Sequence, residues 1–516
     1  MTPSFNTAGP CVPGEHYMLS PESRFARVLR LVEERKYFTL HAGRQTGKTT
    51  AARWLVDHYN GGARYAALWV DIETAREQPD PAKAMRTILA KLDMACARDL
   101  PSLPRPAARE LLEDPSTALL RCLHALSAAA TRPLVVLVDE ADGLVGEAMV
   151  SFLTQLRDGY IDRSRTPFPH ALALIGMRQV RDYAMSSEER RTVSWLGTTS
   201  PFNITAEAAT LAPFGREDVA ELLGQHTAAT GQRFEPEAAA RIYELSQGHP
   251  WLVNALADQI VSRDVEDRAV AVRADHVEAA KETIIVERRT HIDSLVARLR
   301  EPRVQRIVEP MLVGGQTSDD VLDDDFAYVV GLGLVALRGG RYELANPIYR
   351  EVIVRALTHV RQAQLPHETA WYVRPDGALD MRQLLEGFQA FWREDGHLAA
   401  EGFRYREAGP HLMLMAFLQR IVNTGGRIER EYGLGRGALD LVVHWGHDRH
   451  AIEVKLRRDE HTEARALEQL GRYLDGLGLD EGWLVLFDLR KELSWTEKLT
   501  TREVAAAGKS IHVVGC

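Results

Sequence analysis

The sequence predicts an α/β protein of several domains that begins with a doubly wound parallel sheet. Apolar runs at residues 37–41, 65–71, 133–139 and 171–175 alternate with segments of helical periodicity, which is typical of strands that pair in parallel. A glycine-containing loop follows the first run, and a second alternation of strands and helices begins after residue 380. At 516 residues, the chain is long enough for about three domains.

The loop after the first strand has the spacing A-x-x-x-x-G-K-T, with alanine in place of the usual first glycine. A helix-forming run follows, so backbone N–H groups at the helix start are expected to bind the phosphates of ATP. Lys48 would contact the outer phosphates and Thr49 would hold Mg²⁺. The nucleotide-binding residues predicted here are Ala42, Gly43, Arg44, Gln45, Thr46, Gly47, Lys48, Thr49 and Thr50.

Two further strands are expected to end at the same edge of the sheet. The run at residues 133–138 is followed by Asp139 and Glu140. Asp139 would complete the Mg²⁺ shell, and Glu140 would orient or deprotonate the attacking water. The strand at residues 171–175 leads to Arg178, which is a candidate sensor of the γ-phosphate, with a plain surface arginine as the alternative.

Residues 213–289 predict a helical lid after an ATPase core at residues 1–212. Within the lid, Gly248 suits the end of one helix and Pro250 the first turn of the next. The whole pattern resembles P-loop ATPases of the STAND and archaeal AAA-like type. The resemblance rests on Gly47-Lys48-Thr49, Asp139-Glu140, Arg178 and the G-x-P turn at Gly248-His249-Pro250. It implies that Pro250 contacts the adenine.

Residues 290–362 predict a winged-helix domain with a hairpin turn at Gly339-Gly340. The helix that would face DNA in such a domain carries several acids, which repel phosphates. These acids are Asp319, Asp320, Asp323, Asp324 and Asp325. An internal packing role is therefore favoured, as in STAND proteins, where this domain responds to the nucleotide state.

Residues 363–380 are polar and contain prolines, which predicts a linker before a further α/β domain at residues 381–516. An apolar helix at residues 411–422 precedes three expected strands at 427–432, 438–443 and 450–456. Period-two alternation places Glu453 and Lys455 on one face of the third strand, while Asp440 lies in the second. Two carboxylates and a lysine suit metal-assisted phosphodiester hydrolysis, in which both acids bind Mg²⁺ and the lysine steers water.

This C-terminal pattern resembles the PD-(D/E)XK nuclease superfamily, with Asp440, Glu453 and Lys455 as its core. Gln469 and Tyr473 match the Q-x-x-x-Y helix of the RecB branch. The resemblance also implies a further metal-binding glutamate, for which Glu407 is the candidate and Glu429 and Glu431 are rivals. A salt-bridged sheet without activity is the alternative.

Composition narrows the possible functions. The net charge of −9 and the pI near 6.1 indicate no global basic field, so DNA binding requires a local surface. The cysteines are scattered, which predicts neither a zinc site nor a disulfide framework and fits a reducing cytoplasm. They are Cys11, Cys96, Cys122 and Cys516. No apolar stretch is long enough for a membrane span.

Together these patterns predict an ATP-dependent switch fused to a Mg²⁺-dependent DNA nuclease that defends against mobile DNA or handles it. DNA is the expected partner, and a homo-oligomer or an operon-encoded protein are further candidates. Two alternatives stay open. One is a STAND-like regulator whose nuclease-like domain binds DNA without cutting it, and the other is a DNA-stimulated motor.

Overall fold

The computed structural model describes most of the chain. The described residues are 2–41, 43, 45–176, 205–287, 289–312, 324–362, 371–393, 408–423, 426–434, 437–457, 459–490 and 492–516. Four predicted site residues, Ala42, Arg44, Arg178 and Glu407, lie outside them. The chain divides into two compact units. The first comprises Met1–Asp293 and Val321–Ile348, and the second Ser294–Asp320 and Tyr349–Cys516.

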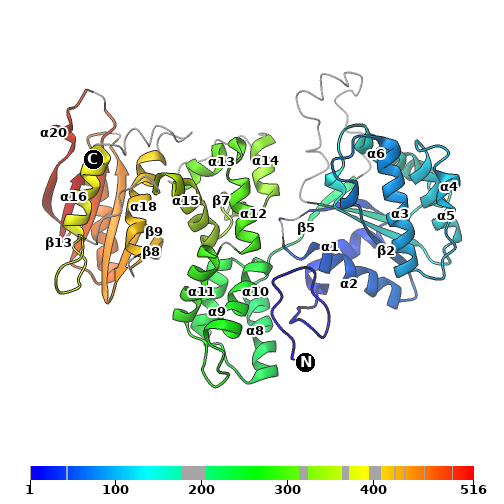
Figure 1. Ribbon diagram of the computed structural model, residues 1–516, viewed down its shortest axis with the longest axis horizontal. Helices are drawn as coiled ribbons and strands as arrows, with labels where there is room; N and C mark the ends of the chain where they lie inside the picture. The colour runs from blue at the N-terminus through cyan, green and yellow to red at the C-terminus, as the bar shows by residue number, and fades with distance from the viewer. Residues whose placement is uncertain are drawn as a thin grey trace. The chain divides into compact units, whose positions relative to one another are not determined.

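A five-stranded parallel sheet forms the centre of the first unit, as predicted (Figure 1). Its strands are β1 Tyr37–His41, β2 Ala66–Asp71, β3 Leu134–Asp139, β4 Ala171–Gly176 and β5 Thr205–Thr210. The spatial order is β2-β3-β4-β1-β5, and every pairing is parallel. The carboxyl ends of β1 and β3 therefore point to one edge of the sheet, with the end of β4 between them.

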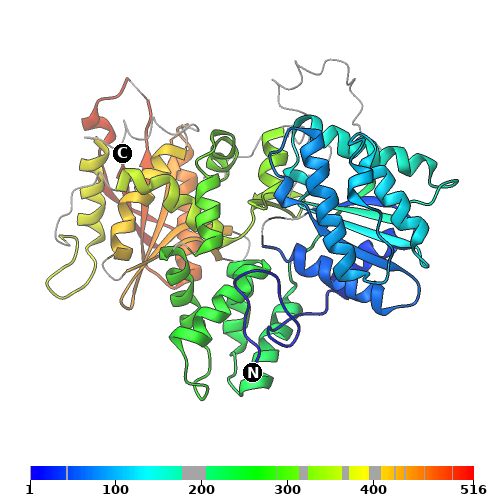
Figure 2. The ribbon, with the colours of Figure 1, turned by 45° about the vertical axis from the view of Figure 1, so that its right-hand side comes forward.

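Helices cover both faces of this sheet (Figures 1 and 2). One face packs against α1 Glu22–Glu33 and α2 Lys48–Gly61. The other packs against α3 Pro81–Asp99, α5 Ala118–Ala129 and α6 Gly146–Asp162. Shorter elements are η1 Glu73–Ala75, α4 Ala108–Leu111 and η2 Ala141–Gly143. Because both faces are buried, the strands are apolar throughout rather than alternating.

The predicted helical segment after residue 213 is present. It consists of α8 Arg216–Thr230, α9 Pro236–Ser246, α10 Pro250–Gln259, η4 Ile260–Asp264 and α11 Ala274–Val286. Pro250 is the first residue of α10, as expected, but α9 is capped by Gln247 with φ 49° rather than by Gly248. Gly248 has φ 74°, and a Cβ there would lie 1.9 Å from the carbonyl oxygen of Phe214. This close backbone approach requires glycine.

The predicted winged-helix segment is divided between the two units. Its elements are α12 Thr290–Arg298, α13 Pro302–Leu312, α14 Asp324–Gly331, β6 Val335–Arg338, β7 Arg341–Leu344 and α15 Pro347–Gln362. The predicted hairpin is confirmed, since β6 and β7 pair antiparallel around Gly339 and Gly340, both with positive φ. Of the acids expected on the DNA-facing helix, only Asp324 and Asp325 lie among the described residues. The winged-helix assignment itself stays a prediction.

A six-stranded mixed sheet forms the second unit (Figure 1). Its strands are β8 Arg427–Leu434, β9 Gly437–Trp445, β10 Asp448–Leu456, β11 Glu481–Phe487, β12 Thr501–Ala506 and β13 Lys509–Gly515. The order is β12-β13-β11-β10-β9-β8. The three predicted strands form an antiparallel meander at one side, whereas β10, β11 and β13 pair in parallel.

The second sheet is also covered on both faces. The helix α19 Thr462–Leu477 packs against one face through Leu470 and Leu474. The other face carries Phe487, whose ring contacts Phe388 of α16 Met381–Phe391. Phe388 in turn contacts Phe417 of α18 Ala408–Asn423. A short helix, α20 Trp495–Lys498, precedes β12. No helix in the described part of the chain is long and apolar enough to cross a membrane.

Candidate functional site

The described residues of the loop between β1 and α2 are Gly43 and residues 45–47. Gln45 and Gly47 have φ of 55° and 90°, which turns the chain sharply before α2 begins at Lys48. The carbonyl oxygen of Gly43 accepts hydrogen bonds from Thr46 Oγ1 and Lys48 Nζ, each at 2.9 Å. The Lys48 side chain is thus directed into the loop, which is where phosphate oxygens would compete for the same protons.

Asp139 lies at the end of β3, beside the loop. Its Oδ2 accepts hydrogen bonds from Thr49 Oγ1 at 3.2 Å and from Trp69 Nε1 at 3.3 Å, and its Oδ1 accepts one from the Glu140 N–H at 3.0 Å. Burial raises the pKa of Asp139, and this effect outweighs the lowering by Lys48 and by the hydrogen bonds from Glu140 and Trp69. The structure therefore brings Lys48, Thr49 and Asp139 together as predicted, around a carboxylate fully supplied with donors.

Glu140 follows Asp139 with φ 57° and forms the N-cap of η2. Its Oε2 accepts a hydrogen bond from Arg76 Nη2 at 2.6 Å. Burial and the nearby Asp142 and Asp139 raise the pKa of Glu140, whereas Lys48 and Arg76 lower it. A partly buried glutamate with a raised pKa suits proton transfer. Its partner Arg76 was not expected from the sequence.

The remaining predicted nucleotide contacts in the described part of the chain include Thr50 and Pro250. The hydroxyl of Thr50 accepts a hydrogen bond from the backbone N–H of Cys11 at 3.0 Å. Pro250 is buried at the start of α10, and its contact with adenine stays a prediction.

The phosphate-binding loop also lies against the turn that follows α14. A Cβ on Gly43 would be 3.2 Å from the Cα of Gly333 and from the carbonyl oxygen of Leu332. Gly333 has φ 76°, so both the conformation and the space favour glycine there. The segment predicted as a winged helix thus contacts the loop itself.

A second cluster lies on the α19 face of the C-terminal sheet. The register Ala451↔Val442 in β10 and β9 places Asp440, Glu453 and Lys455 on that one face. Lys455 Nζ lies 2.6 Å from Glu453 Oε1 and 3.7 Å from Asp440 Oδ2. Asp440 Oδ2 also accepts the backbone N–H of Val454 at 2.8 Å. The predicted triad is therefore assembled.

Glu453 is unusual within this cluster because its side chain is 0% exposed. Neither of its carboxylate oxygens has a hydrogen bond of good geometry, despite the ion pair with Lys455. Burial and the Asp440 carboxylate raise the pKa of Glu453 to about 7, with Lys455 opposing them. Burial would lower the pKa of Lys455, but the two carboxylates raise it. Such a carboxylate is under-supplied with positive charge and donors.

The remaining predicted nuclease residues are placed in part. Gln469 Nε2 donates to Tyr473 Oη at 3.1 Å on α19, and Tyr473 raises the pKa of Lys455. Glu429 pairs with His444 at 3.2 Å, while Glu431 lies in β8. His411, at the start of α18, has a pKa lowered by burial and interacts with Asp440 and Lys455. No cluster of three His, Cys, Asp or Glu side chains able to hold a metal occurs among the described residues.

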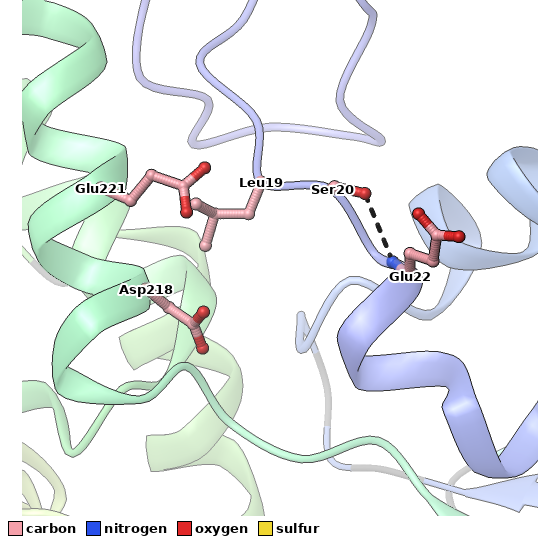
Figure 3. Close-up of a pocket in the computed structure, with 5 residues that line it drawn as sticks. All are labelled: Leu19, Ser20, Glu22, Asp218 and Glu221. Atoms are coloured by element: carbon pink, nitrogen blue, oxygen red, sulfur yellow. Dashed lines mark hydrogen bonds between the residues drawn. The ribbon is translucent and has the colours of Figure 1, made fainter.

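One well-formed cavity of about 410 Å³ lies between the start of α1 and α8 (Figure 3). It is lined by Leu19, Ser20, Glu22, Asp218 and Glu221. Its three carboxylates would repel phosphates. This cavity is therefore distinct from the candidate nucleotide site and does not support one.

Two parts of the chain match protein-family models. Residues 32–183 match a family model described as an AAA domain, and residues 384–491 match a domain of unknown function (DUF8371). The first match contains Lys48, Asp139 and Glu140, and the second contains Asp440 and Glu453. No curated protein matches the chain.

Several solved structures are similar to about two thirds of this chain. A Walker-type ATPase of Pyrococcus abyssi is 13% identical, covers 68% of this chain and 99% of its own, and has a TM-score of 0.48. The Aeropyrum pernix ORC2 protein in ADPNP–ADP complexes is 13% identical, covers 67% and 95%, and has a TM-score of 0.38. The Thermotoga maritima RuvB Holliday junction branch migration motor is 13% identical, covers 65% and 95%, and has a TM-score of 0.33.

The fold, the loop and the family match together define the class of protein to which the N-terminal region belongs. The N-terminal sheet with its A-x-x-x-x-G-K-T loop is a P-loop ATPase core, and it is AAA-like, as the match over residues 32–183 states. The C-terminal match has no assigned activity. The chemistry of that domain has to be argued from its own residues.

Proposed function

We propose that this protein is an ATP-binding and ATP-hydrolysing switch coupled to a Mg²⁺-dependent DNA nuclease. In the first unit, the loop residues 42–50 bind the phosphates and Lys48 neutralises their outer oxygens. Thr49 and Asp139 hold Mg²⁺, and Glu140 is the base that takes a proton from water. Arg178 serves as the γ-phosphate sensor, and Pro250 packs on the adenine. The shared contact of Thr49 with Asp139 supports this arrangement.

The nuclease half of the proposal depends on one observation, the buried carboxylate of Glu453 whose oxygens lack well-formed hydrogen bonds. Such oxygens, next to the Asp440 carboxylate, provide the hard ligands that Mg²⁺ prefers. A bound Mg²⁺ would polarise the phosphodiester and supply hydroxide at neutral pH. Asp440 and Glu453 would hold it, with Glu407 as a third ligand.

Lys455 and Gln469 would act on the substrate side of this cluster. The ammonium of Lys455 lies beside both carboxylates and would offset the charge that develops on the attacked phosphate. The hydroxyl of Tyr473 accepts a hydrogen bond from Gln469. Tyr473 also raises the pKa of Lys455. The interaction of Tyr473 with Lys455 supports a role for this helix motif beside the proposed metal ligands.

The contact between Gly43 and Gly333 supports coupling through the segment at residues 290–362. Phosphates entering the loop would change the surface that the α14–β6 turn touches. This segment would then respond to the nucleotide, which agrees with an internal packing role rather than DNA binding. We propose that the protein handles or destroys mobile DNA in the cytoplasm, and that another copy of the chain or an operon-encoded protein is its partner.

The decisive experiment is a cleavage assay with the full chain, supercoiled and linear DNA, and Mg²⁺ or Mn²⁺, with and without ATP. Glu453→Gln and Asp440→Asn should lower cleavage roughly 100-fold or more. Asp448→Asn, an exposed acid at the start of β10, is the matched control and should cut normally. Wild-type protein that cuts no DNA under any condition contradicts the nuclease proposal.

A second candidate function is a STAND-like regulator whose C-terminal domain binds DNA without cutting it. The observation that favours it is the Lys455 ammonium, which lies beside Asp440 and Glu453 and offsets part of their charge without a metal. DNA binding that persists in Mg²⁺-free buffer, with no cleavage and with ATP-dependent affinity, would support this candidate. Turnover of ATP that DNA strongly accelerates would instead indicate a motor.

A further inference from the structure

The sequence gives Trp69 no role beyond an apolar position in β2, yet its indole contacts the carboxylate proposed to hold Mg²⁺. The Nε1–H of Trp69 donates to Asp139 Oδ2 at 3.3 Å, and both side chains are buried. The same oxygen accepts the Thr49 hydroxyl at 3.2 Å. Two donors therefore converge on Oδ2 from opposite sources, one from the phosphate-binding loop and one from the neighbouring strand.

The backbone of Trp69 is fixed on its outer side. Its N–H donates to Asp99 Oδ2 at 2.9 Å, and its carbonyl oxygen accepts Arg98 Nη2 at 2.5 Å. Arg98 and Asp99 form an ion pair with each other at 2.6 Å. Because β2 is an edge strand, these groups have no strand partner there, and the end of α3 supplies both of their hydrogen bonds instead.

Two cations also lie over the ring of Trp69. The guanidinium carbons of Arg53 and Arg98 lie 5.3 Å and 5.0 Å from its centroid. Cations at the ring make the indole N–H a better donor, since they withdraw electron density from it. The geometry is therefore that of a fixed, polarised donor directed at one carboxylate oxygen.

We propose that Trp69 is a positioning residue for the divalent cation that accompanies ATP, because it fixes the orientation of the Asp139 carboxylate. The inference rests on the proposed nucleotide site. Trp69 touches neither nucleotide nor cation, and it acts only through Asp139. By donating to Oδ2, it fixes the rotation of the carboxylate.

The test is Trp69→Phe, which keeps an aromatic ring in the core but removes the N–H. The Mg²⁺ concentration that half-saturates ATP turnover should rise roughly tenfold, which is the effect of one hydrogen bond to a charged group. Nucleotide affinity in EDTA should not change.

Trp54→Phe is the matched control. Trp54 lies on α2 and stacks on Phe25 and His58 without contacting Asp139, so its Mg²⁺ requirement should match that of the wild type. A merely structural Trp69 predicts a lower melting temperature with an unchanged Mg²⁺ half-saturation, and that result would overturn the inference. If Trp69→Phe does not fold, Arg98→Ala, which removes one anchor of Trp69, should still raise the Mg²⁺ requirement, by roughly threefold.

Failure of the proposed site itself would look different. Wild-type protein without Mg²⁺-dependent nucleotide binding refutes the nucleotide site and, with it, this inference. Wild-type protein that needs Mg²⁺, together with a Trp69→Phe variant that needs no more of it, refutes only the role of Trp69.

Discussion

Asp139 and Glu453 are buried carboxylates on strands of two different sheets, but the surroundings of the two groups are opposite. Asp139 accepts three hydrogen bonds from Thr49, Trp69 and the Glu140 backbone. Glu453 has the ammonium of Lys455 and the carboxylate of Asp440 beside it, and neither of its oxygens has a hydrogen bond of good geometry. The first carboxylate is held in one orientation before any ligand arrives, whereas the second is held in an environment that opposes its charge.

This difference indicates how each site would respond to a cation. At Asp139 the donors fix geometry, so a cation arriving with the nucleotide finds a prepared ligand. At Glu453 a cation would relieve an electrostatic cost, so metal binding should also stabilise the fold.

Glu140→Gln should reduce the kcat of ATP hydrolysis by about 1,000-fold, because the proposed base loses its ability to take a proton. ATP should still bind, since Lys48, Thr49 and Asp139 are unchanged. Single-turnover kinetics together with calorimetry would measure both. Glu147→Gln, an exposed acid in the first turn of α6, should leave hydrolysis unchanged. Wild-type turnover in Glu140→Gln would remove Glu140 from its assigned role.

Glu453→Gln should stabilise the protein at pH 8 by about 3 kcal/mol, since the pKa near 7 lies above the ordinary 4.5. The folded state binds this proton more tightly than the unfolded state does. The stabilisation from that proton is complete below about pH 4.5 and is lost as pH rises to about 7. The melting temperature of the wild type should fall as pH rises through this range, and that of the variant should change less.

The same variant also tests the metal without an activity assay. Mg²⁺ or Mn²⁺ at pH 8 should raise the melting temperature of the wild type but not that of Glu453→Gln. Asp448→Asn should behave as the wild type. An equal rise in melting temperature in the wild type and in Glu453→Gln would mean that the ion binds somewhere other than Glu453.

Asp139→Asn makes the same chemical change at the other carboxylate and should have the opposite sign. Its amide would direct N–H groups toward the donors of Thr49 or Trp69, leaving at least one donor without an acceptor. We expect a loss of about 1 kcal/mol, because relief of the buried charge partly offsets the lost hydrogen bonds. An Asp139→Asn variant more stable than the wild type would show that removing the charge has the same effect on stability at Asp139 as at Glu453.

Arg76→Ala should have the smallest effect. Without its guanidinium, the pKa of Glu140 should rise further above its ordinary value, so the acidic limb of the pH–rate profile moves to higher pH. Turnover at pH 6 should fall roughly threefold while the KM for ATP is unchanged. Arg76→Lys should restore most of the loss, and Arg105→Ala, which breaks an exposed pair with Asp93, should show none.

The residues that the sequence could indicate are those in local patterns. Lys48 and Thr49 follow a fixed spacing, Asp139 ends an apolar run, and Glu453 and Lys455 are two positions apart on a strand. For each of these residues, neighbours in the chain determine the direction of the side chain. The hairpin at Gly339-Gly340 was predictable for the same reason, since both positions need positive φ.

Residues that act across the sheet were not predictable. Trp69 reaches Asp139 only because β2 lies next to β3, with Asp71 opposite Asp139 in the register. Arg76 reaches Glu140 because η1 and η2 follow these two strands. The only signal in the sequence was a tryptophan near the end of a predicted strand, which has an N–H that must be satisfied when buried. The strands β11, β12 and β13 were also missed.

The outer edge of β2 has a consequence for assembly. Asn60 bonds both backbone groups of Ala67, at 2.8 Å and 2.9 Å, and Arg98 and Asp99 do the same for Trp69. The outward-facing amides and carbonyls of both residues are therefore occupied. A strand from another molecule could add to this edge only by displacing four side-chain hydrogen bonds, which protects the sheet against edge-to-edge aggregation. A copy of this ATPase core is therefore not expected to continue the sheet past β2.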